Sequence, residues 1–118
     1  MTPETPAHFQ SMQLPAAPDY LAPDGSAIRS LPAVRGGSLA YCTLPAGAIS
    51  HAVVHQTVEE IWYCLAGTGQ LWRRGPAEAE ITDLVPGTCI TILVGTQFQF
   101  RTTSANELHL LIATILIV

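Results

Sequence analysis

The sequence has no lysine, and charged residues make up only 12 % of its 118 residues. All five basic residues are arginines, and only Arg73 and Arg74 are adjacent. The net charge is −4, so there is no basic cluster of the kind that contacts phosphate groups. We therefore expect no nucleic-acid partner.

Cysteine and long apolar runs are also scarce. The three cysteines, Cys42, Cys64 and Cys89, are odd in number and have no C-x-x-C spacing. The longest apolar run, residues 110–118, is too short to cross a membrane as a helix. The N-terminal residues show no signal-peptide pattern. These absences predict a cytoplasmic protein with reduced thiols and no membrane partner.

Apolar residues, by contrast, make up 48 % of the chain, enough for one domain with a hydrophobic core. Glycine, proline, aspartate and asparagine recur at short intervals after residue 24, and the segments between them alternate or are β-branched. Two examples are residues 79–84 and 97–102. We predict eight to ten short strands and no helix, an all-β antiparallel sandwich or barrel.

The two ends of the chain differ from this pattern. Residues 1–25 contain five of the nine prolines and no periodicity, which predicts an extended N-terminal arm before a barrel domain of residues 26–118. Residues 107–118 predict a long apolar strand with no later segment to cover it. Because an uncovered apolar edge promotes aggregation, we expect this strand to lie within the sheet and a second copy to cover apolar surface, giving a homodimer.

Polar side chains gather in one stretch, Gly47 to Gly69. In a strand, alternate side chains share a face. On this basis His51, Val53 and His55 lie on one face of a first strand, and Glu60, Trp62 and Cys64 share one face of a second. The step between the strands is Gln56-Thr57. Each strand then presents an ionisable side chain, His55 or Glu60, to a common interior.

Two glycine-framed motifs run through the chain. Gly47 is followed after five residues by Val53, after one by His55, after four by Glu60 and after six by Gly67. This spacing resembles the first conserved motif of the cupins, which has glycine, five residues, His-x-His, three or four residues, glutamate, six residues and glycine. The resemblance implies a cupin-like β-barrel, also called a jelly roll or double-stranded β-helix.

The second motif follows downstream. Gly87 is followed after five residues by Leu93, after one by Gly95, after two by Phe98 and after three by Thr102. The second cupin motif has glycine, five residues, Pro-x-Gly, two residues, histidine, three residues and asparagine. The resemblance covers about the last two thirds of the chain.

The resemblance also implies a metal site, of which this sequence keeps two of the four ligand residues. Metal-binding cupins use both histidines and the glutamate of the first motif and the histidine of the second. Here Val53 and Phe98 stand at two of these positions, which leaves His55 and Glu60 as candidate ligands of a divalent ion (Zn, Ni, Fe or Mn). Two protein ligands hold such an ion weakly, since catalytic sites usually have three or more.

Phe98 fills space at a ligand position and repels water, which favours an apolar pocket. We predict a small-molecule-binding cupin with a vestigial metal site and no assigned reaction. The expected pocket is lined by Val53, His55, Glu60, Trp62, Phe98 and Phe100. The alternative is a divalent-metal-dependent cupin enzyme of isomerase or oxygenase type that uses His55 and Glu60. A third hypothesis is a structural or regulatory dimer without a ligand.

Three further side chains leave alternatives open. His51 lies about 13 Å from His55 along an extended strand, too far to share one ion, so we place it at the barrel mouth. His109 is either a half-buried histidine with hydrogen-bond partners or, if it faces the interior, a replacement ligand. Cys64 is a buried inert cysteine or, with no histidine-thiol motif in support, a soft-metal ligand or nucleophile.

Overall fold

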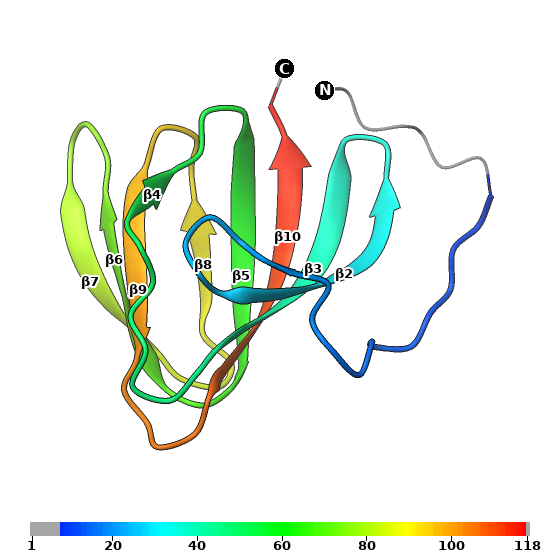
Figure 1. Ribbon diagram of the computed structural model, residues 1–118. Coiled ribbons are helices and arrows are strands. Elements are labelled where there is room, and N and C mark those ends of the chain that lie inside the picture. Colours follow the sequence, from blue (N-terminus) through cyan, green and yellow to red (C-terminus); the bar gives the residue numbers. More distant parts are fainter. Residues whose placement is uncertain (1–7, 118) are drawn as a thin grey trace.

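Two antiparallel sheets face each other and enclose the interior of the molecule (Figure 1). The computed structural model describes residues 8–117, a range that contains ten strands and no helix, and so no helix able to span a bilayer. The strands are β1 (Tyr20–Leu21), β2 (Ala27–Val34), β3 (Gly37–Leu44), β4 (Val53–Val54), β5 (Val58–Ala66), β6 (Gly69–Arg74), β7 (Ala79–Leu84), β8 (Cys89–Ile92), β9 (Gln97–Thr102) and β10 (Leu108–Leu116).

The predicted all-β architecture is confirmed. One sheet has the order β1-β2-β3-β10-β5-β8 and the other has the order β4-β9-β6-β7. Strands β7 and β9 occupy the predicted segments, residues 79–84 and 97–102. Alternating burial along β9 arises because Phe98 and Phe100 face the interior, while Arg101 points to solvent.

The long final strand lies within the six-stranded sheet, as predicted. β10 pairs with β3 on one side and with β5 on the other, so neither of its edges is open. Leu108, Leu110 and Ile112 point inward and are at most 7 % exposed. The apolar sequence of β10 is therefore explained by its central position.

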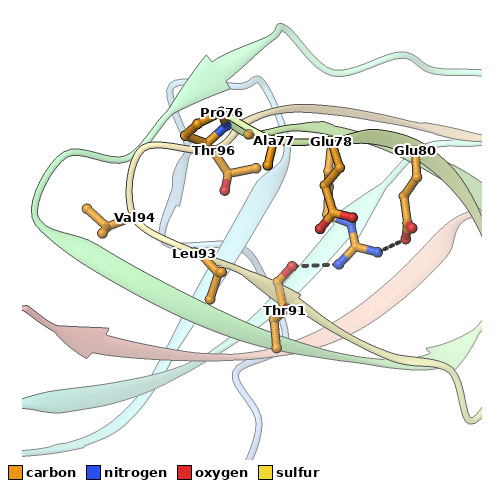
Figure 2. A pocket seen from close by; sticks show the side chains of 10 residues that line it. Pro76, Ala77, Glu78, Glu80, Thr91, Leu93, Val94 and Thr96 are labelled. Atoms are coloured by element: carbon orange, nitrogen blue, oxygen red, sulfur yellow. Dashed lines mark hydrogen bonds and ion pairs between the residues drawn. The ribbon is translucent and has the colours of Figure 1, made fainter.

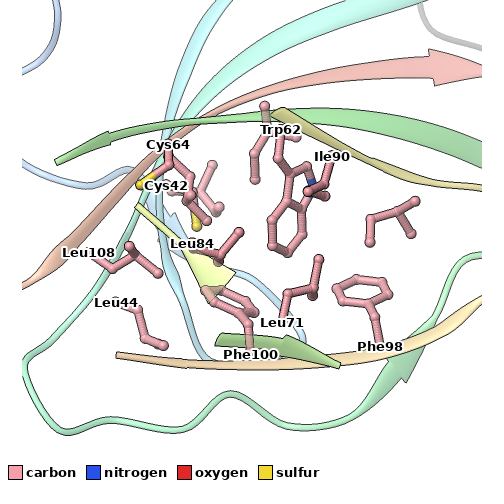
Figure 3. Close-up of a cluster of buried hydrophobic side chains, with 14 residues drawn as sticks. Cys42, Leu44, Trp62, Cys64, Leu71, Leu84, Ile90, Phe98, Phe100 and Leu108 are labelled. Atoms are coloured by element: carbon pink, nitrogen blue, oxygen red, sulfur yellow. The ribbon is translucent and has the colours of Figure 1, made fainter. Parts of the chain in front are cut away.

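The core forms where the inner faces of the two sheets meet (Figure 3). Trp62 of β5 is 1 % exposed and packs edge-on against two rings of β9. Its ring centroid lies 5.6 Å from that of Phe98 and 5.0 Å from that of Phe100, with interplanar angles of 85° and 72°. Such perpendicular packing is a favoured geometry for aromatic pairs. Leu71 and Leu84, from β6 and β7, are fully buried beside them.

The predicted strand through His51, Val53 and His55 is wrong in extent, because only Val53–Val54 is a strand. The backbone N–H of His51 donates to the carbonyl of Asp24 at 2.7 Å instead of to β9. His55 follows the strand and leads into the turn before β5. Only Val53 and His55 of the three reach the interior, and His51 is exposed.

A change of register next to β4 explains this difference. Ile49 forms a bridge with Arg101, whereas Val53 pairs with Phe98. The step from Ile49 to Val53 is four residues, whereas the matching step from Arg101 to Phe98 is three. One extra residue on one of two paired segments is the effect of a β-bulge. Because a shift of one residue reverses the face of a side chain, His51 points away from the interior.

Part of the predicted arm belongs to the sheet. The first seven residues of the arm lie outside the described residues. Tyr20 and Leu21 form β1, which pairs with β2. The chain then crosses in front of the barrel between the two sheets (Figure 1) before it enters β2. Residues 22–26 consequently cover one side of the interior.

Candidate functional site

A cavity of about 330 Å³ lies between β4 and β9 of one sheet and β2, β3, β5 and β10 of the other. The structure brings all six residues of the predicted pocket to its walls: Val53, His55, Glu60, Trp62, Phe98 and Phe100. The other lining residues are Ala22, Pro23, Asp24, Ser26, Ile28, Cys42, Val54 and Ile112. The walls are therefore mainly apolar, with a few polar groups among them.

His55 and Glu60 form an ion pair at this cavity. The Nε2 atom of His55 lies 3.4 Å from the Oε1 atom of Glu60, and their side chains are 31 % and 12 % exposed. The His55 ring also packs on Phe98, with a centroid distance of 5.2 Å. The turn between β4 and β5 is short, so it brings the two residues of the motif together.

Glu60 has two further hydrogen-bond donors. The indole Nε1 of Trp62 donates to Oε1 at 3.0 Å, and the Thr114 hydroxyl donates to Oε2 at 3.2 Å. Both oxygens of Glu60 therefore accept hydrogen bonds within the protein. These bonds fix the carboxylate against the wall of β5 and β10.

These contacts shift the pKa of both groups. Hydrogen bonding to Glu60 raises the pKa of His55 above 6.5, although burial opposes the shift. Burial is the largest single influence on Glu60 and acts to raise its pKa. The hydrogen bonds from His55, Trp62 and Thr114, together with the His55 charge, outweigh it and hold the pKa of Glu60 below 4.5. The pair therefore favours its ionised form.

The pair predicts a pH-dependent contribution to stability. The raised pKa of His55 stabilises the fold fully below pH 6.5, an effect lost as pH rises through the folded-state pKa. The lowered pKa of Glu60 stabilises it above pH 4.5, an effect lost as pH falls through the folded-state pKa. We expect Glu60→Gln to lower the free energy of unfolding most between these two pH values, by about 1 kcal/mol. Urea unfolding at several pH values measures this loss.

The neighbouring Glu59 provides the matched control for this experiment. Its carboxylate accepts a hydrogen bond from the backbone N–H of Val94 at 3.1 Å, away from the cavity. Glu59→Gln should show no maximum in its effect between pH 4.5 and 6.5. An equally flat profile for Glu60→Gln contradicts the assigned coupling of His55 and Glu60.

Asp24, Ser26 and Cys42 line the cavity but were missed by the sequence analysis. The Asp24-Gly25 dipeptide is typical of a turn, and no local pattern indicates that this turn covers the interior. Asp24 is 8 % exposed and Ser26 is 1 % exposed. Burial raises the pKa of the Cys42 thiol to about 12, so this cysteine is a neutral wall residue.

The remaining candidates lie outside the cavity. The Tyr41 hydroxyl lies 2.6 Å from Nδ1 of His109, and Oε1 of Glu107 lies 3.2 Å from its Nε2. His109 is half-buried on the outer face of β10, so it does not replace a lost ligand. Cys64 is fully buried in the core, where burial raises the pKa of its thiol. His51 is exposed beside the Asp24-Gly25 turn.

The residues of the cavity do not fit a catalytic metal ion. His55 and Glu60 supply two donors, whereas Val53 and Phe98 supply none at the other motif positions. Nowhere in residues 8–117 do three His, Cys, Asp or Glu side chains form a group able to hold an ion. Both Glu60 oxygens also accept hydrogen bonds from the protein, so His55 and Glu60 do not make up the ligand set of a catalytic metal.

A second cavity, of about 320 Å³, opens beside the β6–β7 turn (Figure 2). A guanidinium nitrogen of Arg73 donates to the backbone carbonyl of Thr91 at 2.8 Å, and the guanidinium pairs with Glu80. The guanidinium also donates to the Thr82 hydroxyl at 3.1 Å. These bonds connect β8 of one sheet to β6 and β7 of the other, so Arg73 acts as a structural link.

Comparison with known proteins identifies the fold. No protein-family model and no curated protein match the sequence. Among solved structures, a cupin protein from Bacteroides fragilis has a TM-score of 0.71 at 23 % identity, covering 92 % of this chain and 84 % of that one. A recombinant oxalate oxidase in complex with glycolate has a TM-score of 0.75 at 18 % identity, covering 91 % and 59 %.

The Cnp3 cupin domain of Schizosaccharomyces pombe has a TM-score of 0.70 at 11 % identity, covering 77 % of this chain. The chain spans 64 % of that domain's length. At such identities the comparisons establish the architecture, in agreement with the two glycine motifs and the paired sheets. The chain therefore has the cupin fold, an all-β jelly roll.

Proposed function

We propose that this protein binds a small molecule in the cavity beside His55 and Glu60. The observation that supports the proposal most strongly is the cavity itself, with about 330 Å³ of space at the end of a packed aromatic core. Small-molecule sites are typically concave, mostly apolar and equipped with few polar groups. Phe98 and Val53 form part of the apolar wall, and the His55–Glu60 pair provides the polar contacts that orient the ligand.

The fold alone leaves several functions open. Cupin-fold structures include an oxalate oxidase in complex with glycolate and Drosophila melanogaster CENP-C bound to CAL1. One fold therefore serves catalysis in one protein and protein binding in another. The donor set of this cavity favours binding over metal-dependent catalysis, because only His55 and Glu60 of the four motif positions offer donors. The metal-dependent isomerase or oxygenase thus remains the alternative.

Titration with benzyl alcohol tests the proposed function. Its ring and hydroxyl match an apolar wall with few polar groups, and we expect a dissociation constant on the order of millimolar. In ¹⁵N–¹H NMR spectra, the amide resonances of Ser26 and His55 should shift saturably. Val53→Trp fills the cavity and should abolish the shifts.

Ile81→Trp is the matched control, since Ile81 is 67 % exposed on the outer face of β7. This variant should bind benzyl alcohol as the wild type does. The proposal is contradicted if the wild type shows no saturable shifts, or if Val53→Trp leaves them unchanged. Loss of binding in both variants equally points away from the cavity.

We also propose that the chain forms a homodimer through the outer face of β5 and β10. Ile61, Tyr63 and Leu65 of β5 are 48 %, 44 % and 41 % exposed, and Ile115 of β10 is 43 % exposed. Ile61 and Tyr63 stand opposite Ala113 and Leu111 in the β5–β10 register, so the apolar side chains form a continuous patch. Exposed patches of this kind mark interaction surfaces.

Light scattering coupled to size-exclusion chromatography tests this dimer. The wild type should elute with twice the mass of one chain, and Tyr63→Glu should elute as a monomer because it places a charge in the patch. Ile81→Glu, on the other sheet, should remain dimeric. A monomeric wild type, or a dimeric Tyr63→Glu protein, contradicts the proposed surface.

A further inference from the structure

The turn at residues 22–26 holds a carboxylate at the cavity. The N–H of Ala22 donates to the carbonyl of Ser26 at 2.8 Å, and the N–H of Gly25 donates to the carbonyl of Ala22 at 2.8 Å. The carbonyl of Asp24 accepts from His51 N–H at 2.7 Å, which ties the turn to the β4 side of the barrel. This segment crosses in front of the barrel (Figure 1). The hydrogen bonds within the turn and the bond from His51 hold Asp24 in place.

Only one oxygen of this carboxylate has partners in the protein. The Oδ1 atom of Asp24 accepts from the backbone N–H of Ser26 at 2.9 Å and from its hydroxyl at 2.6 Å. Both hydrogen bonds end on Oδ1, and none within residues 8–117 ends on Oδ2. Asp24 is 8 % exposed and lines the cavity. The only fully buried side-chain nitrogen or oxygen without a partner in residues 8–117 is Nε of Arg29, so Oδ2 reaches solvent-accessible space. A ligand in the cavity can therefore donate a hydrogen bond to it.

Carboxylates outnumber cationic groups around the cavity. Its charged or titratable lining residues are Asp24, Glu60, His55 and Cys42, and no arginine is among them. Protonated His55 balances Glu60, to which it is paired at 3.4 Å. Cys42 is neutral, because burial raises its thiol pKa to about 12. His55 acts electrostatically on Asp24 as well as on Glu60, so two carboxylates of the cavity share one cationic group.

The rest of the cavity wall is apolar and favours a ligand with an apolar body. Apolar atoms of Phe98, Phe100, Trp62, Ile28 and Ile112 surround most of the space. A volume of about 330 Å³ suits a compact organic molecule. Aromatic faces also attract organic cations.

We propose that the cavity selects a small organic ammonium ion, whose N–H groups donate to Oδ2 of Asp24 while its apolar body packs on the β9 aromatic residues. This inference rests on the proposed function and specifies its ligand class. The ammonium supplies both the missing donor and the missing positive charge. An ammonium is preferred to a bare metal ion because the apolar wall contacts its carbon body. In addition, Asp24, His55 and Glu60 do not form a group able to hold an ion, and no other such group occurs in residues 8–117.

Three probes of one shape test the proposal: benzylamine, benzyl alcohol and benzoate, which are cationic, neutral and anionic at pH 7. Titrations followed by the amide shifts of Ser26 and His55 should give benzylamine about tenfold tighter binding than benzyl alcohol, with benzoate weakest. Equal or tighter binding of the alcohol or benzoate overturns the ammonium proposal but leaves the proposed function standing. If none of the three binds, the proposed function itself fails.

The Asp24→Asn variant tests whether Asp24 causes the preference for the ammonium probe. The asparagine retains Oδ1 as the acceptor for Ser26, while an NH₂ group replaces Oδ2 and removes the charge. The tenfold preference for benzylamine over benzyl alcohol should vanish. Asp83→Asn makes the same charge change on an exposed residue of β7 and should keep the preference. A preference that persists in Asp24→Asn overturns the assignment. If that variant does not fold, the comparison of the three probes in the wild type still decides.

Discussion

Replacing Gly67 with alanine should destabilise the protein by more than about 3 kcal/mol, whereas the same change at Gly47 should cost about 1–2 kcal/mol. Both are glycines of the first motif, and both have positive φ, +79° and +71°. A residue with a Cβ atom is strained in this region. That part of the cost is shared by the two variants.

The two sites differ in their surroundings. A Cβ atom on Gly67 would lie 2.4 Å from the carbonyl oxygen of Glu107 and 3.0 Å from the Cα atom of Leu108. Both atoms belong to the backbone at the start of β10, so they move only if the strand moves. A Cβ atom on Gly47 would meet nothing within 4 Å. Gly67 is therefore required by close approach as well as by conformation.

Urea unfolding of the two variants measures the difference directly. We expect Gly67→Ala to unfold at a much lower urea concentration than Gly47→Ala, at the same slope. Similar midpoints for the two variants contradict the close packing of the β5–β6 turn on the start of β10. The result also tests why the first motif ends in glycine.

Much of the fold follows from short-range patterns in the sequence. The alternation around Phe98 and Phe100 fixes which face of β9 is buried, and the glycine spacing places the turns. These signals depend on neighbouring residues, so the sequence carries them directly. The same reasoning brought Val53, His55, Glu60 and Trp62 to one cavity, because strand parity and the motif frame agreed.

The parts that sequence reasoning missed depend on distant pairings. The face of His51 is set by a one-residue change of register against β9, between Ile49 and Val53. Asp24 reaches the cavity because the short strand β1 folds back on β2. Neither event leaves a local periodicity, and the Asp24-Gly25 turn looks the same whether it covers the interior or faces solvent.

Restoring the lost histidines should create a metal site. The double variant Val53→His/Phe98→His places histidine at the two motif positions that lack it. Val53 and Phe98 stand opposite each other in the β4–β9 register, and both line the cavity with His55 and Glu60. Four donors around one cavity suit a divalent ion such as Zn²⁺ or Ni²⁺. We expect at least about a hundredfold gain in Zn²⁺ affinity over the wild type.

Calorimetric titration with Zn²⁺ measures this gain, and the same variant with His55→Ala added should lose most of it. Phe98 is 1 % exposed, so the double variant will be less stable without metal, and Zn²⁺ should raise its melting temperature but not that of the wild type. If the folded double variant binds Zn²⁺ no better than the wild type, the motif positions do not converge as the structure places them.

The metal content of wild-type protein purified without chelator distinguishes a small-molecule cavity from a metal centre. If this cavity is an apolar receptor for a small molecule, with His55 and Glu60 as a hydrogen-bonded pair, elemental analysis of the purified chain should find no stoichiometric metal. A stoichiometric divalent ion that disappears in the His55→Ala variant would show instead that the cavity is a metal site.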